Sequence, residues 1–155
     1  MIEQKAAFLK NEVIPLLHTL ESRQKGNWGK MDAQQMVEHL RDVCKVANGK
    51  IELSLINTDP AALEAARAFV MSESHFKENT RVPVMPSEPR AHKYGSMSEA
   101  IAKLEPELAD VFAVYAANPS LTLMHPIFGA LNYEEQIQYL DKHIRHHLRQ
   151  FGLVD

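Results

Sequence analysis

The sequence lacks the features that mark several large classes of protein. Its 155 residues include one cysteine, Cys44, which excludes an internal disulfide and gives no sign of an oxidising compartment. The net charge is −3, so no general basic excess would attract nucleic acid or anionic lipid. No apolar run approaches the length of a transmembrane helix, and the charged N-terminal segment lacks the apolar stretch of a signal peptide. We therefore expect a cytoplasmic protein with neither a nucleic-acid partner nor a membrane partner.

Several catalytic motifs are also missing. The sequence has no H-E-x-x-H motif, which marks zincin proteases, and no paired E-x-x-H motifs, which mark di-iron carboxylate bundles. It has no C-x-x-C pair, no glycine-rich phosphate loop and no G-x-S-x-G motif. The function must therefore be sought in another pattern of residues.

The composition, which is 45% hydrophobic and 24% charged, is typical of an ordinary globular protein. The length suits one hydrophobic core, and no internal repeat or low-complexity tract divides the chain. Apolar residues recur at helical spacing in five segments, at about residues 2–22, 33–48, 60–72, 97–117 and 133–151. We predict a single all-α domain over residues 1–155, arranged as an antiparallel helical bundle.

Local signals refine the predicted helices. Pro15 should break or kink the first segment, leaving a short extra N-terminal helix, and Pro106 should kink the fourth. The second to fifth segments each follow a residue that favours the helix N-cap, namely Asp32, Asp59, Ser96 and Asn132. Ser96 is followed by Glu99, which suggests a capping box. Residues 118–132 are expected to form a loop, and residues 50–56 are the only short candidate for a strand.

A long stretch between the third and fourth predicted helices should not be helical. Residues 72–97 contain three prolines, which remove backbone donors and resist helix formation: Pro83, Pro86 and Pro89. We expect a long ordered crossover loop within one domain, of the kind that often carries function.

The last predicted helix carries three histidines within a stretch of five residues, in "DKHIRHHLRQFG" at 141–152. At about 100° per residue, His143 and His147 fall on the flank of the apolar face, whereas His146 falls outside it and should point to solvent. Residues four apart lie one turn apart, so His143 and His147 could bind one metal ion. The alternative is that both are hydrogen-bonded residues at the edge of the core.

A third ligand could come from the second predicted helix, where His39 lies at the edge of the apolar stripe. His39, His143 and His147 would then form a three-histidine metal site. Three neutral protein ligands leave one position open for water or substrate, as in catalytic zinc sites. Imidazole suits zinc, nickel, copper and iron alike, so the pattern does not distinguish between them.

Two segments together resemble the DinB-like superfamily: "WGKMDAQQMVEHL" at 28–40 and "HPIFGALNYEEQIQYLDKHIRHHLRQFGL" at 125–153. They are most similar to a subfamily with a W-G-x-M…H-L segment and a terminal H-x-x-H-H-x-x-Q helix. "FKENT" at 76–80 is also similar, and the likeness covers roughly residues 27–153.

The resemblance implies a four-helix bundle with up-down-down-up connections, and a homodimer is common in the superfamily. It also implies a divalent metal, zinc or nickel above others, whose three ligands match His39, His143 and His147. Members of the superfamily include enzymes that use a low-molecular-weight thiol (bacillithiol, mycothiol or glutathione) and some hydrolases.

Two functions follow from these observations. The first is a metal-dependent enzyme, a thiol-dependent transferase or a hydrolase, that acts on a small-molecule substrate. The second is a non-catalytic module in which the metal stabilises a bundle that binds a small molecule or a protein. No general base can be named, although Gln136 is expected to line the pocket. His125 is either a fourth ligand, a proton shuttle or a packed loop residue, and Cys44 is expected to be buried and inert.

Overall fold

The computed structural model describes residues 1–79 and 86–155, which contain six helices and a two-stranded sheet. The helices are α1 (Ile2–Asn11), α2 (Val13–Leu17), α3 (Ala33–Ala47), α4 (Pro60–Met71), α5 (Met97–Ala117) and α6 (Tyr133–Gln150). The strands are β1 (Leu123–His125) and β2 (Gly129–Leu131). The prediction of a mostly helical protein is confirmed, but the sheet was not expected. Pro83 and the end of the "FKENT" segment lie outside the described residues.

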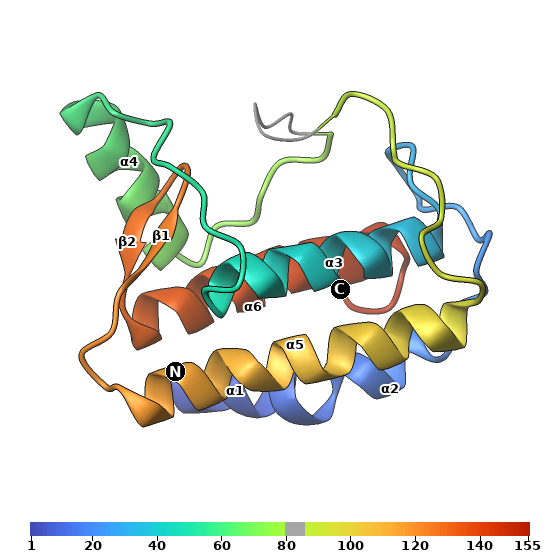
Figure 1. Cartoon of the computed structure of the whole chain (residues 1–155). Helices are drawn as coiled ribbons and strands as arrows, with labels where there is room; N and C mark the ends of the chain where they lie inside the picture. The colour runs from blue at the N-terminus through green and yellow to red at the C-terminus, as the bar shows by residue number, and fades with distance from the viewer. Residues whose placement is uncertain (80–85) are drawn as a thin grey trace.

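Four helices, α1, α3, α5 and α6, lie side by side along their lengths (Figure 1). Helix α3 contacts α5 and α6, and α1 contacts the same two helices, so the four enclose a common core. In Figure 1, α3 and α5 run in one direction, while the α1–α2 segment and α6 run in the other. Helix α4 packs against α6 at one end, beside the β1–β2 hairpin.

Side-chain caps set the starts of α3, α4, α5 and α6. The Asp32 carboxylate accepts from the Gln35 backbone N–H and the Gln35 side chain accepts from Asp32, which is a complete capping box at α3. Helix α6 begins with the same arrangement, formed by Asn132 and Glu135. At α5 the predicted box is incomplete. The Ser96 hydroxyl caps the helix, but the Glu99 carboxylate accepts from the backbone N–H of the preceding Gly95 instead.

The N-terminal segment forms two short helices, as predicted from Pro15, and the first of them ends at Asn11, whose carbonyl a proline four residues later would meet. Helix α1 ends at Asn11 and α2 begins two residues later, so Pro15 lies in the first turn of α2. Backbone N–H groups in a first turn have no partner within the helix, so a proline is tolerated there. Helix α2 then ends at Leu17 rather than near residue 22. Helix α5 runs unbroken through Pro106 over the predicted range.

Residues 118–132, expected to form a loop, contain the antiparallel β1–β2 hairpin. Leu123 pairs with Leu131 and His125 with Gly129, whose φ of +79° suits the tight connection. The Tyr115 hydroxyl donates to the Leu131 carbonyl, which ties the hairpin to α5. Each strand has three residues, too few for an alternating pattern to show in the sequence. The candidate strand at 50–56 has no strand pairing.

The core is one cluster of buried apolar side chains drawn from residues 6 to 151. Cys44 is buried within it, as predicted, and burial raises the pKa of its thiol far above the ordinary range. Within the described residues, no helix is both long enough and apolar enough to span a bilayer.

Candidate metal centre

Helices α3 and α6 each bury one apolar face in the core, and their histidines lie at the edge of the contact between them. The structure brings His39 of α3 together with His143 and His147 of α6. The Nε2 atoms of His39 and His143 are 3.2 Å apart, and those of His143 and His147 are 3.1 Å apart. All three available ligand atoms lie within 4.8 Å of one another. His39 and His143 are partly buried, and His147 is buried.

These separations fit a shared metal ion. Two nitrogens bound to one zinc at 2.0–2.1 Å with tetrahedral angles lie about 3.3–3.4 Å apart. The two closest pairs in the cluster fall within about 0.3 Å of that value. Three imidazoles form a donor set that suits zinc, nickel and other late transition metals. The cluster therefore fits a divalent metal on its donor set and on its spacing.

The tautomer of His147 is fixed from behind. The Gln150 side-chain amide donates to the Trp28 carbonyl at 2.9 Å. Because a carbonyl can only accept, the atom that faces it must be the amide nitrogen, and the other atom must be the amide oxygen. The amide oxygen then faces His147 Nδ1 at 2.9 Å and must accept from it. With the proton on Nδ1, the Nε2 lone pair of His147 points into the cluster. Such hydrogen bonds behind the ligand orient metal-binding histidines.

His143 also has a hydrogen-bonding partner behind its ring, a hydroxyl that can either donate or accept and so orients the ring without selecting its tautomer. The Tyr139 hydroxyl lies 2.7 Å from His143 Nδ1, one helical turn earlier on α6. Tyr139 is buried, and burial raises the pKa of its hydroxyl well above the ordinary value, so it remains protonated at neutral pH. Its ring packs against the His125 ring, with ring centroids 4.6 Å apart. Tyr139 thus connects His143 to the hairpin that carries His125.

Burial keeps the three imidazoles neutral. The pKa of His39 is lowered to about 4, mainly by burial, with a further contribution from His146. Burial also places the pKa values of His143 and His147 well below the ordinary value, and each is lowered further by the neighbouring histidines. Neutral imidazole is the form that binds metal, so the environment favours ligation at neutral pH.

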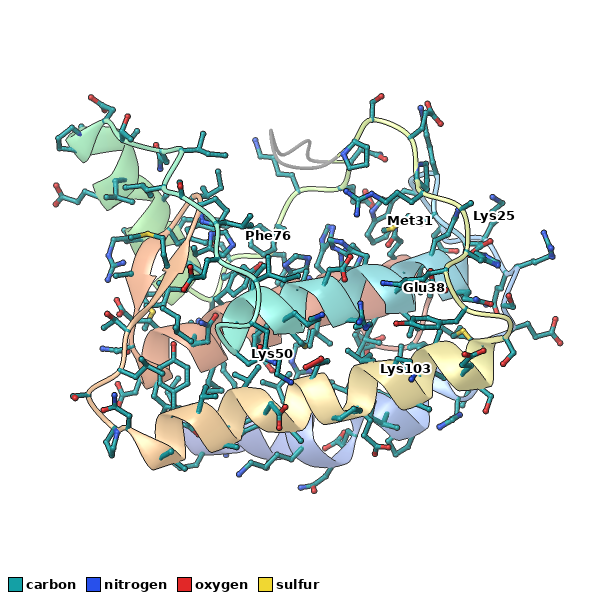
Figure 2. The ribbon with its side chains drawn as sticks, viewed as in Figure 1. Lys25, Met31, Glu38, Lys50, Phe76 and Lys103 are labelled. Atoms are coloured by element: carbon teal, nitrogen blue, oxygen red, sulfur yellow. The ribbon has the colours of Figure 1, made fainter. Side chains whose placement is uncertain are left out.

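His146 does not point to solvent as predicted. It is half-buried, and its ring lies 5.7 Å from the Trp28 ring, 5.9 Å from the Phe76 ring and 5.2 Å from the His147 ring. The helical wheel placed it correctly outside the apolar face of α6. The wheel could not show that residues 27–29 and 74–77 cover that side of the helix. Figure 2 shows Phe76 on the segment beside α3 and α6.

Other candidate residues have structural roles. The prediction that Gln136 lines the metal pocket is wrong, because its amide donates to the Ala47 carbonyl and the Tyr115 hydroxyl inside the core. His125 lies at the end of β1, where its Nδ1 accepts from the backbone N–H groups of Ile127 and Phe128. Its Nδ1 is therefore committed to the turn, and burial lowers its pKa to about 4.

Sequence reasoning assigned no role to Tyr139, Phe76 or Gln150, although all three lie beside the cluster. Gln150 stands in the terminal H-x-x-H-H-x-x-Q pattern, three residues after His147, and that position was the available signal. Tyr139 precedes His143 by one turn, as a residue behind a ligand would. Phe76 belongs to the long connection and has no periodic signal.

Comparison with known proteins gives no family assignment: no family model matches the chain, and no curated protein or solved structure shows significant similarity to it.

Proposed function

We propose that this chain is a divalent-metal-binding helical protein of the DinB-like class, with His39, His143 and His147 as its ligands. The observation that carries the proposal is the convergence of three neutral imidazole nitrogens from two helices. The particular function that we propose is that of a metal-dependent enzyme, a thiol-dependent transferase or a hydrolase. The two sequence motifs that resemble the superfamily support the class. The single buried cysteine suits a reducing compartment such as the cytoplasm.

A bound zinc or nickel ion would supply Lewis acidity and lower the pKa of a water or thiol at its open position. The chain's own residues prepare the site for that chemistry. Gln150 holds the proton of His147 on Nδ1, and Tyr139 fixes the ring of His143. The rings of Phe76 and Trp28 pack against the His146 ring on that side of α6. These apolar rings suit the organic part of a small-molecule substrate.

The second candidate is a non-catalytic module that binds a small molecule or a protein. One observation favours it: the Phe76 ring packs against both His143 and His146, at 6.0 Å and 5.9 Å between ring centroids. A side chain held there could fill the space that a substrate would need. The two candidates therefore differ in whether the metal has an exchangeable ligand.

Elemental analysis of untagged protein tests the metal site. We expect about one zinc or nickel per chain in wild type, and loss of the metal in His39→Ala and in His147→Ala. His146→Ala is the matched control, because it removes an adjacent imidazole that is not a ligand. Metal retained in His147→Ala, or lost equally in His146→Ala, would contradict the assigned ligand set.

Cobalt substitution separates the two candidates, because the visible spectrum of bound cobalt(II) reports its ligands. For an enzyme with an open position, we expect the spectrum to change when a low-molecular-weight thiol such as glutathione is added. An unchanged spectrum, with cobalt still bound, would favour the non-catalytic module.

A further inference from the structure

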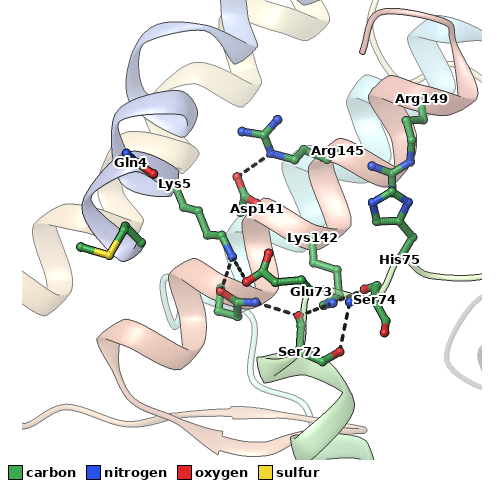
Figure 3. A pocket seen from close by; sticks show the side chains of 12 residues that line it. Gln4, Lys5, Ser72, Glu73, Ser74, His75, Asp141, Lys142, Arg145 and Arg149 are labelled. Carbon is green, nitrogen blue, oxygen red and sulfur yellow. Dashed lines mark hydrogen bonds and ion pairs between the residues drawn. The ribbon is translucent and has the colours of Figure 1, made fainter. Parts of the chain in front are cut away.

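A polar hollow of about 310 Å³ lies apart from the histidine cluster, between the start of α1, α6 and the segment that leaves α4 (Figure 3). Among the residues that the structure describes, four cationic side chains line it, together with two carboxylates, those of Glu73 and Asp141. The cations are Lys5, Lys142, Arg145 and Arg149. The hollow is therefore positive, although the whole chain has a net charge of −3.

The sequence places these residues on one face of α6. Gln138, Lys142, Arg145 and Arg149 follow one another at intervals of three or four residues, which is the spacing of a single helical face. His143 and His147 follow Lys142 and Arg145 on the adjoining face. Because of the helical repeat of α6, His143 and His147 face α3, while the cationic side chains face α1 and residues 72–75.

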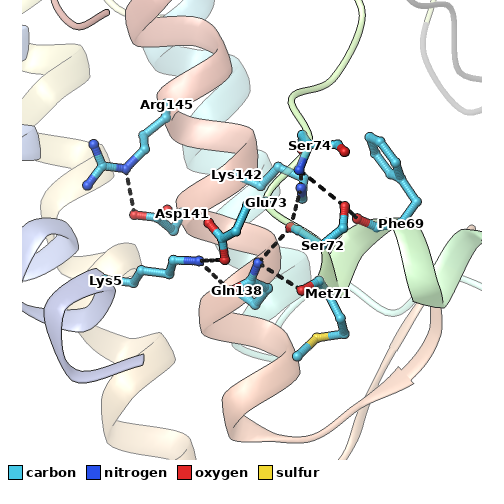
Figure 4. A network of polar contacts seen from close by, with 10 residues as sticks. All are labelled: Lys5, Phe69, Met71, Ser72, Glu73, Ser74, Gln138, Asp141, Lys142 and Arg145. Atoms are coloured by element: carbon cyan, nitrogen blue, oxygen red, sulfur yellow. Dashed lines mark hydrogen bonds and ion pairs between the residues drawn. The ribbon is translucent and has the colours of Figure 1, made fainter. Parts of the chain in front are cut away.

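Both carboxylates of the hollow already have partners (Figure 4). Glu73 accepts from the Lys5 ammonium at 2.7 Å, and Asp141 accepts from Arg145 Nε at 2.9 Å. Lys5 also donates to Gln138 at 2.6 Å, and Arg145 lies over the Phe8 ring at 3.6 Å from its centroid. Two of the four cations are therefore neutralised and fixed in place.

Lys142 and Arg149 have no carboxylate within ion-pair distance among the described residues. The Lys142 ammonium donates to the backbone carbonyls of Ser72 and Ser74 and lies over the Phe69 ring. These groups accept its hydrogen bonds, but they carry no net charge to balance it. Lys142 is buried, with only 7% of its surface exposed. Burying a lysine without a partner anion costs free energy. Arg149 adds, at the same hollow, a second cation without an ion-pair partner in the described part of the chain.

From this arrangement we propose that the hollow binds a small dianion, and specifically the phosphoryl group of a phosphorylated small molecule. The two excess positive charges match the charge of a phosphate monoester. The guanidinium of Arg149 offers a planar fork of donors, and Lys142 offers a point charge with a further N–H, a combination that suits phosphate oxygens. The proposal does not depend on a metal at the histidine cluster.

The test is calorimetric titration of inorganic phosphate into the purified protein at constant ionic strength. We expect saturable binding to wild type and at least tenfold weaker binding to Arg149→Gln. Arg149→Lys, which keeps the charge, should recover part of the affinity. Arg23→Gln is the matched control, because Arg23 is exposed on a loop away from the hollow and its loss changes the net charge equally.

Two further arms locate the anion and identify it. In His39→Ala, phosphate affinity should equal that of wild type, because His39 lies on the other side of α6. A loss of phosphate affinity in this variant would mean that phosphate binds a metal at the histidine cluster, and would overturn the proposal. Succinate, a carboxylate dianion, should bind at least tenfold more weakly than phosphate. Equal binding of succinate, or an equal loss of phosphate affinity in Arg23→Gln, would also overturn it.

Discussion

His147 is held in one tautomer by a single side chain, that of Gln150. The Gln150 amide bridges His147 Nδ1 and the Trp28 carbonyl, so it fixes both the proton and the orientation of the ring. Space around it is also restricted. A Cβ at Gly29 would lie 2.6 Å from the Gln150 amide nitrogen, and Gly29 has a φ of +78°. The loop before α3 therefore closes tightly on Gln150 and supports the ligand from behind.

Gln150→Leu should weaken metal binding by about 10- to 100-fold, because loss of a hydrogen bond behind a ligand histidine has effects of that size. The measurement is competition with a chelator of known affinity. Gln136→Leu is the matched control, since it removes a buried glutamine of the same helix that contacts the Ala47 carbonyl and the Tyr115 hydroxyl instead. Equal weakening in both variants would show that only general destabilisation is at work.

The lowered pKa values of the buried histidines predict how the metal-free protein responds to acid. The pKa values of His39 and His125 are about 4 in the folded protein, against an ordinary value of 6.5. Below pH 6.5 the unfolded chain binds more protons than the folded one, so the free energy of unfolding falls as the pH drops towards 4. The slope is about 1.4 kcal/mol per pH unit for each proton taken up.

Urea denaturation of metal-free protein between pH 7 and pH 4 measures this effect. His125→Gln should decline less steeply than wild type over that range, because one of the contributing imidazoles is gone. His18→Gln, at an exposed position, should follow the wild-type curve. A free energy of unfolding that does not change between pH 7 and pH 4 would show that the histidines are not buried in the neutral form.

At the scale of elements, α3 and α6 were predictable because their signals are local. Asp32 with Gln35 and Asn132 with Glu135 mark their starts, and the apolar stripes set their faces. Placing His39, His143 and His147 beside the core needed only those faces. The β1–β2 hairpin was not predictable, because its short strands are stabilised by distant groups such as the Tyr115 hydroxyl and Arg67. The burial of His146 likewise depends on the long connection.

The capping box of α6 gives a prediction at this scale. Asn132→Ala removes the side chain that accepts from the Glu135 backbone N–H, and should lower the free energy of unfolding by about 1 kcal/mol. Urea denaturation measures the change. Asn118→Ala is the control, because the Asn118 side chain accepts from the Ser120 hydroxyl at an exposed site. A larger effect at Asn118 would show that the cap does not limit the stability of α6.

Across the whole molecule, the histidine cluster joins parts of the chain that are far apart in sequence. His39 and His143 are separated by 104 residues, and the segment between them includes α4, α5 and the hairpin. A metal held by both helices would therefore link α3 to α6 in the folded state alone, because the unfolded chain has no preformed site. Binding to the folded state stabilises it by mass action.

Zinc should accordingly raise the stability of the whole protein. At a free concentration 100 times its dissociation constant, a ligand of the folded state adds about 2.7 kcal/mol to the free energy of unfolding. We expect a rise of that order for wild type and for His146→Ala, measured by urea denaturation of chelator-treated protein with and without zinc. His39→Ala and His147→Ala should show no such rise, because each leaves only two of the three imidazoles. If zinc stabilises His39→Ala as much as wild type, the metal binds within α6 alone and the link between the two helices does not exist.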